Sequence, residues 1–133
     1  MRSIIFPYTR FGGRFAPIIP VTLFSRSLAF KTEAYVDSGA FCSIFQSEIL
    51  EVLQLTKEEA QTKILKAADG NFIPAYLFRL PIQIADRRLR AAIAFSDKLK
   101  IGFNLLGRQS IFSAFEEVVF NEREKKVIFR YEN

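Results

Sequence analysis

The sequence contains no histidine. This absence excludes Ser-His-Asp triads and Cys-His dyads, and it removes most kinds of zinc site, because each of these depends on an imidazole. An enzyme of this composition must take its acid–base chemistry from carboxylates, Lys, Tyr or Cys. We therefore expect neither a metal nor any other cofactor.

Cysteine and long apolar runs are also scarce. The single cysteine, Cys42, excludes an intramolecular disulfide. Arg2, Arg10 and Arg14 interrupt the apolar residues near the N-terminus, so no stretch approaches the ~20 residues that a membrane-spanning helix needs. No signal-peptide pattern is present. We expect a cytoplasmic protein that does not contact a membrane.

The charge is positive but dispersed. Lys and Arg number 19 against 14 Asp and Glu, and bases alternate with acids, as in residues 86–90 and 122–126. A nucleic-acid surface normally shows a basic stripe with aromatic platforms, so we expect no nucleic-acid partner. The length of 133 residues fits one domain, and half of the residues are apolar, fifteen of them Phe. Some of that apolar surface is expected in an interface, because a small domain cannot bury all of it.

Strand-like patterns occupy most of the chain. Residues 1–13 of this single 1–133 domain are interpreted as a loose leader or an edge arm. The predicted strands are Pro17–Phe24, Leu28–Val36, the hairpin Thr62–Phe78 around a tight Asp69-Gly70 turn, Leu80–Ile84, Leu89–Phe95, Glu117–Phe120 and Val127–Tyr131. Helical turns are predicted at Ser47–Leu55 with Ser47 as N-cap, at Thr56–Glu59 as a capping box, and at Gly107–Phe115. About eight strands and two short helices indicate a closed or sandwiched β domain.

Two short motifs carry candidate chemistry. The first is an apolar strand that runs directly into Asp37-Ser38-Gly39-Ala40. Taken alone, these residues fit an ordinary strand-ending turn. The second motif lies about seventy residues downstream. It is the apolar pair Leu105-Leu106 followed by Gly107-Arg108.

Together, in this order and in a β-rich chain, the motifs resemble the retropepsin-like family of aspartic proteases, in its single-domain cellular form. Members carry Asp-Ser/Thr-Gly-Ala after a strand, then a hairpin flap, then two apolar residues with Gly-Arg opening a short helix. The resemblance covers roughly residues 16–131. It implies an all-β, closed acid-protease-type barrel with one or two short helices, which forms one half of a two-fold symmetric homodimer.

The resemblance also implies an activity and its residues. Two carboxylates about 3 Å apart cannot easily both ionise, so one can act as base and the other as acid in peptide hydrolysis. One of them would be Asp37, and the other would come from a second copy of the chain. The implied catalytic residues are Asp37, Ser38 and Gly39; those for substrate are Ala40, Ala68, Asp69 and Gly70; those bracing the loop are Leu105, Leu106, Gly107 and Arg108. The expected substrate is an extended peptide with apolar residues around the cut.

The chain departs from the family pattern next to the first motif. Phe41 stands where several members have a carboxylate that pairs with the arginine of Gly-Arg, so Arg108 needs another acceptor. Two alternatives to a protease stay open: a non-catalytic peptide-binding module on the same fold, and a structural β domain with a coincidental turn. Cys42 also has two interpretations, a redox switch or a small buried apolar residue.

Overall fold

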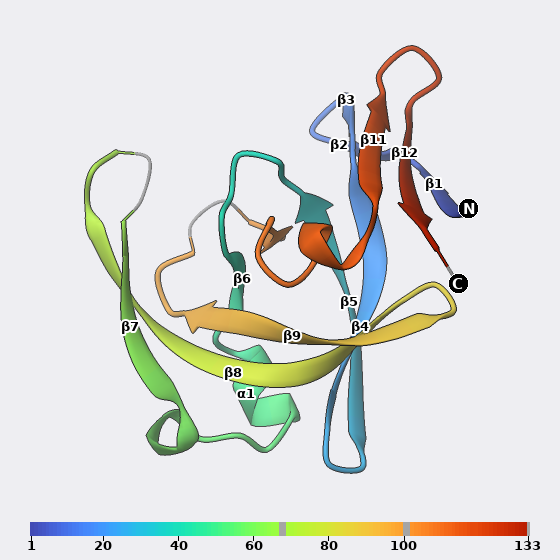
Figure 1. The fold of residues 1–133 in the computed structure, drawn as a ribbon. Helices are drawn as coiled ribbons and strands as arrows, with labels where there is room; N and C mark the ends of the chain where they lie inside the picture. The colour runs from blue at the N-terminus through green and yellow to red at the C-terminus, as the bar shows by residue number, and fades with distance from the viewer. Residues whose placement is uncertain (67–68, 100–101, 133) are drawn as a thin grey trace.

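The computed structural model describes residues 1–66, 69–99 and 102–132, and most of them lie in strands (Figure 1). The main sheet has the order β4 (Ile18–Ser25), β5 (Leu28–Val36), β10 (Asn104–Leu106), β6 (Ser43–Gln46), β9 (Arg87–Ser96), β8 (Phe72–Ile84) and β7 (Gln61–Lys66). β8 also pairs with β4, opposite Thr22 and Leu23, so the sheet closes on itself. The predicted all-β class is confirmed.

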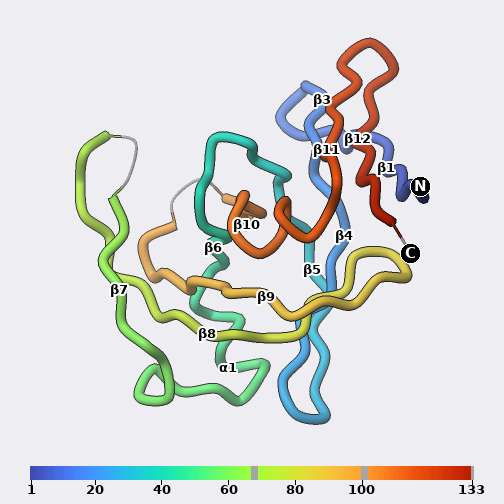
Figure 2. Tube along the Cα trace, in the orientation of Figure 1, coloured from blue at the N-terminus to red at the C-terminus, as the bar shows by residue number. Residues whose placement is uncertain are grey.

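A smaller sheet is formed by the two ends of the chain. Its order is β1 (Arg2–Pro7), β12 (Lys126–Tyr131) and β11 (Glu117–Asn121), all antiparallel (Figure 2). A short hairpin, β2 (Thr9–Phe11) and β3 (Arg14–Ala16), follows β1. Of the two interpretations of residues 1–13, the structure favours the edge arm over the loose leader. The segment is held in place because Ile4 and Tyr8 are buried in the core.

β8 joins the second half of the predicted hairpin Thr62–Phe78 to the predicted strand Leu80–Ile84 in one continuous strand. It pairs with β7 through residues 72–77 and with β9 through residues 76–84. Pro81 lacks a backbone N–H, and it lies where β8 has β9 on one side but neither β7 nor β4 on the other. The second strand of the predicted hairpin and the predicted strand Leu80–Ile84 are therefore one element.

The helical segments are shorter than predicted. The one α-helix in the described part of the chain is a single turn, α1 (Ile49–Val52), and a 3₁₀ turn at Phe112–Ala114 replaces the helix predicted at Gly107–Phe115. The capping box at Thr56 and Glu59 is confirmed, on a 3₁₀ turn. Among the residues described, no helix is long and apolar enough to cross a membrane.

The prediction of Ser47 as N-cap was wrong, since Glu48 occupies that position. The Ser47 hydroxyl instead donates a hydrogen bond to Asp97, which also accepts one from the Lys57 ammonium at 2.9 Å. The hydrogen bond from Ser47, followed by that from Lys57, lowers the pKa of Asp97 below its usual value. A tertiary contact between α1 and the end of β9 has thus taken the side chain away from the helix terminus.

The core lies inside the closed sheet and beneath the smaller one. Phe45, Phe95 and Phe129 are its largest fully buried side chains. Four other Phe residues are exposed: Phe11, Phe15, Phe41 and Phe72. Apolar surface therefore remains available for contacts outside the monomer.

Candidate active site

Asp37 follows the last residue of β5 and opens a loop that runs to residue 42. Its backbone N–H donates to the Leu106 carbonyl at 3.0 Å. Its carboxylate oxygen Oδ1 accepts the Gly39 N–H at 2.9 Å, and its carbonyl accepts the Ala40 N–H at 3.2 Å. Asp and Gly form such turns readily, because the short carboxylate can satisfy a backbone donor two residues later. The half-buried Asp37 side chain is thereby fixed at the end of the strand.

The Asp37 loop connects β5 to β6, and β10 lies between these two strands in the sheet. β10 runs parallel to β5 on one side and antiparallel to β6 on the other, so Leu105 pairs with both Tyr35 and Ile44. The strands that precede and follow the Asp37 loop are therefore not neighbours. The loop crosses over the end of β10, where the second sequence motif begins.

The backbone of Gly107 and Arg108 donates hydrogen bonds to the Asp37 loop and to the residue that follows it. The Gly107 N–H donates to the buried Ser43 hydroxyl at 2.9 Å, and the Arg108 N–H donates to the Ala40 carbonyl at 2.9 Å. A Cβ at Gly107 would lie 2.4 Å from the Cys42 carbonyl oxygen, closer than real Cβ atoms approach. The two motifs that the sequence separates by seventy residues are thus in direct contact.

The Arg108 side chain contacts an aromatic ring. Its guanidinium carbon lies 6.0 Å from the centre of the Phe41 ring, a distance at the outer limit of a cation–π contact. It has no carboxylate partner within the described residues. Phe41 is 61% exposed, and its carbonyl accepts the Gln109 N–H at 2.8 Å. The carboxylate missing from the family pattern is therefore replaced by a ring that faces solvent.

The hairpin predicted over Thr62–Phe78 is formed by β7 and β8, and we call it the flap. Among the described residues, the last pair of this hairpin joins Lys66 to Phe72. Asp69 and Gly70 are exposed at its tip. Ala68, the third residue expected there, lies outside the described residues.

The flap tip stands apart from the Asp37 loop in Figures 1 and 2. The carboxylate of Asp69 accepts hydrogen bonds from the backbone and side chain of Asn71, each at 3.0 Å. Gly70 has a φ of +88°, which suits a residue without Cβ. The predicted substrate-binding residues that the structure describes are therefore divided between two segments, with Ala40 in the Asp37 loop and Asp69 and Gly70 at the flap tip.

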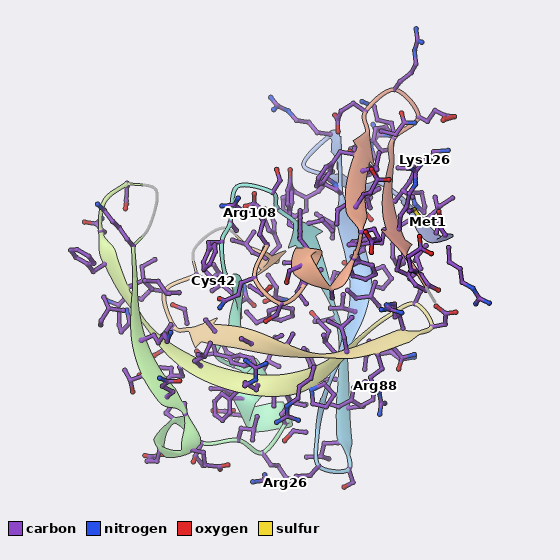
Figure 3. The ribbon with its side chains drawn as sticks, viewed as in Figure 1. Met1, Arg26, Cys42, Arg88, Arg108 and Lys126 are labelled. Atoms are coloured by element: carbon purple, nitrogen blue, oxygen red, sulfur yellow. The ribbon has the colours of Figure 1, made fainter. Side chains whose placement is uncertain are left out.

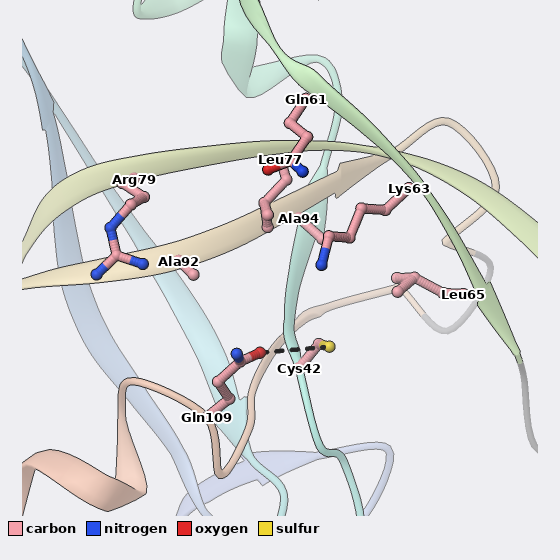
Figure 4. A pocket seen from close by; sticks show the side chains of 9 residues that line it. All are labelled: Cys42, Gln61, Lys63, Leu65, Leu77, Arg79, Ala92, Ala94 and Gln109. Atoms are coloured by element: carbon pink, nitrogen blue, oxygen red, sulfur yellow. Dashed lines mark hydrogen bonds between the residues drawn. The ribbon is translucent and has the colours of Figure 1, made fainter.

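A cavity of about 260 Å³ lies beneath the flap strands, and we name it the flap cavity (Figure 4). Its upper wall comes from alternate residues of β7 and β8, which share one face of the sheet: Gln61, Lys63, Leu65, Leu77 and Arg79. Sequence reasoning did not identify this wall. The sequence signal that could have identified it is the alternation in β8. Phe78 and Leu80 pack on the core, so Leu77 and Arg79 point to the opposite face of the strand.

The remaining wall connects the flap cavity to the Asp37 loop. β9 contributes Ala92 and Ala94, and the loops contribute Cys42 and Gln109. The Cys42 sulfur lies 3.9 Å from the Gln109 Oε1 (Figure 4), and Figure 3 places Cys42 and Arg108 in the same central region. Cys42 is half-buried beside open space, so it is not the fully buried apolar residue of one interpretation.

The described residues include no cluster of three or more Cys, Asp or Glu side chains that could hold a metal ion. The chemistry that the site offers is that of one oriented carboxylate per chain, in a loop whose last residue, Cys42, lines the flap cavity. Such a group can accept or donate one proton, but not both at once.

Comparison with known proteins shows the class of fold. No family model matches the sequence, and no curated protein matches it. Among solved structures, the chain superposes on a retropepsin-like protein with a TM-score of 0.65, over 98% of this chain and 90% of the other, at 18% identity. The fold is therefore the retropepsin-like all-β fold that the two motifs predicted. The structure matched is that of a retropepsin-like aspartic protease from Rickettsia conorii.

Proposed function

We propose that this chain is the protomer of a homodimeric aspartic endopeptidase, in which Asp37 and its copy in a second chain share one water molecule. The observation that carries the proposal is the position of Asp37. It is a carboxylate directly after β5, whose last residue Val36 is buried, in a loop held by β10 within a retropepsin-like fold.

The chemistry requires a pair of carboxylates. When two of them lie about 3 Å apart, one stays protonated and the pair titrates as a unit. The ionised group removes a proton from water as the oxygen attacks the peptide carbonyl carbon. The protonated group then donates to the nitrogen as the C–N bond breaks. Asp37 is the only acid in residues 37–42, which is why the second carboxylate is assigned to another copy.

The neighbouring residues have roles that fit this pairing. Ser38 and Gly39 are exposed beside Asp37, where a hydroxyl can bond the second copy and a residue without Cβ lets substrate approach. Phe41 supplies exposed apolar surface in the same loop, of the kind that a partner covers. The flap tip at Asp69 and Gly70 would close over the bound peptide and exclude water.

The decisive experiment mixes active and inactive copies. Wild-type chain and Asp37→Asn are unfolded together, refolded in known ratios, and assayed on a peptide library, with dimerisation followed by sedimentation. If each site needs two copies of Asp37, activity falls with the square of the wild-type fraction, to about one quarter in an equal mixture. Pure Asp37→Asn should remain dimeric and lose about 10²–10⁴-fold in rate.

The matched control is Asp86→Asn, which neutralises an exposed carboxylate at the turn between β8 and β9. It should retain full activity. Cleavage that falls only linearly with the wild-type fraction, or that survives in pure Asp37→Asn, contradicts the shared site. Tight peptide binding by wild type without cleavage at any pH from 4 to about 8 would assign the fold to a peptide-binding module.

A further inference from the structure

The flap cavity contains two cations and no acid. Lys63 and Arg79 both line it, and none of its lining residues is Asp or Glu. Neither cation forms an ion pair within the described part of the chain. Two unpaired positive charges at one cavity raise its electrostatic potential, and low-dielectric walls concentrate that field.

The strand pairing fixes the direction of both side chains. Lys63 pairs with Ala75 and Arg79 with Ala92, and in both strands alternate residues point to the same face. The two cations lie on either side of Leu77 along that face. Figure 4 shows their charged heads on the side of the flap strands where Cys42 and Gln109 lie.

The rest of the cavity suits a side chain with an apolar stem and a polar head. Leu65, Leu77 and the small Ala92 and Ala94 provide apolar walls, while the amide of Gln109 can donate a hydrogen bond. The small side chains leave the volume of about 260 Å³ open, enough for one amino-acid side chain and water.

We propose that the flap cavity is a specificity subsite for an acidic side chain, so that the peptides this protein selects carry Asp or Glu at one position near the cut. The carboxylate would accept charge-assisted hydrogen bonds from Lys63 and Arg79. This inference rests on the proposed function only in taking the cavity as part of a peptide-binding cleft. It refines the expected substrate, which is no longer apolar throughout.

The test measures binding separately from cleavage. Fluorescein-labelled octapeptides of Ala and Leu, with one Glu, Gln or Lys placed at each position in turn, are titrated with the Asp37→Asn protein at low salt. At one position, Glu should bind about tenfold more tightly than Gln, a difference of about 1.4 kcal/mol. Because both cations are exposed, the preference should shrink in 1 M salt, where charges are screened within about 3 Å.

Substitutions on the Asp37→Asn background identify the residues responsible for the preference. Lys63→Met and Arg79→Met should each reduce the Glu-over-Gln preference about threefold, and the double variant should abolish it. The matched control is Lys66→Met, which removes the same charge from the same strand but on the opposite face. It should leave the preference within about twofold. Reversing both charges, Lys63→Glu with Arg79→Glu, should transfer the preference to the Lys peptides.

The outcomes separate this inference from the proposed function. Equal binding of Glu and Gln peptides at every position overturns the acidic subsite, and so does a preference that survives the double Met variant. Cleavage of these peptides by wild type without any Glu preference leaves the protease and removes the subsite. Glu-selective binding without cleavage by wild type keeps the subsite and removes the protease.

Discussion

Replacing Gly107 with Ala tests how the candidate site is assembled. The added Cβ would lie 2.4 Å from the Cys42 carbonyl oxygen, 2.6 Å from its carbonyl carbon and 2.9 Å from the Ala40 carbonyl oxygen. All three are backbone atoms, so relief requires the Asp37 loop to move. The φ of Gly107 is outside the left-handed region, so any loss arises from the close approach and not from backbone strain.

The magnitude follows from two terms. Overpacking costs about 1–3 kcal/mol, and loss of the hydrogen bond from Gly107 to Ser43 costs about 1 kcal/mol more. The expected destabilisation is therefore about 2–4 kcal/mol, which corresponds to a fall in Tm of roughly 10 °C for a domain of this size. Activity should fall by more than the loss of folded protein explains, because the displaced loop carries Asp37.

The assay is urea unfolding followed by far-UV circular dichroism at one fixed protein concentration, because the chain has no Trp. Hydrogen exchange should show faster opening of residues 37–42. The control is Gly12→Ala, which has a φ of +58° and nothing within 4 Å of the new Cβ, so it should lose only about 1 kcal/mol. A Gly107→Ala protein within about 0.5 kcal/mol of wild type would refute the close contact between the two motifs.

Three further predictions concern titration. Ser47→Ala should raise the pKa of Asp97 toward its usual value, as measured by carboxyl NMR. In the wild type, the lowered pKa contributes stability above about pH 4 that is lost as the pH falls. The free energy of unfolding of the variant should therefore vary less with pH in the acid range. Burial, with the hydrogen bond to Glu122, raises the pKa of Tyr8. The contribution of Tyr8 to the stability of the fold is therefore present below about pH 10 and lost as the pH rises above it. Tyr8→Phe should cost about 1 kcal/mol at pH 7 and flatten that alkaline loss in urea titrations. The preference for Glu peptides should vanish below about pH 4, where a Glu side chain becomes protonated, and a preference that persists at pH 3 would contradict recognition of a carboxylate.

The sequence predicted the elements whose signal is local. The strand Leu28–Val36 was predicted with its observed bounds, because its partial alternation ends at turn-forming residues. By contrast, β6 and β10 were not predicted as strands. Each has only three or four residues, too few to show a period, and β10 is stabilised by partners about sixty to seventy residues away. The length of α1 was overestimated for a related reason, since Ser47 bonds to distant Asp97.

The candidate site was predicted only in part. From the resemblance, we predicted that Asp37, Gly107 and Arg108 belong to one site. The structure places the Asp37 loop in contact with Gly107 and Arg108. The flap cavity was missed, because identifying it requires the register of the flap strands as well as their alternation. Arg79 lies between two core residues in the sequence, which would have indicated its outward direction, but its proximity to Cys42 depends on the closure of the whole sheet.

The position of β10 also bears on the order of events during synthesis. Asp37 leaves the ribosome about seventy residues before Leu106 and Gly107, the residues that fix its loop. The hairpin of β4 and β5 is complete by residue 36, yet the place beside β5 can be filled only when residues 104–106 pair with it in parallel. Parallel pairing at this separation is slow, because the loop-closure entropy precedes any gain from contacts. A nascent or truncated chain that ends before residue 104 therefore carries the Asp37 carboxylate without the residues that hold its loop, and these arrive only with the last quarter of the polypeptide.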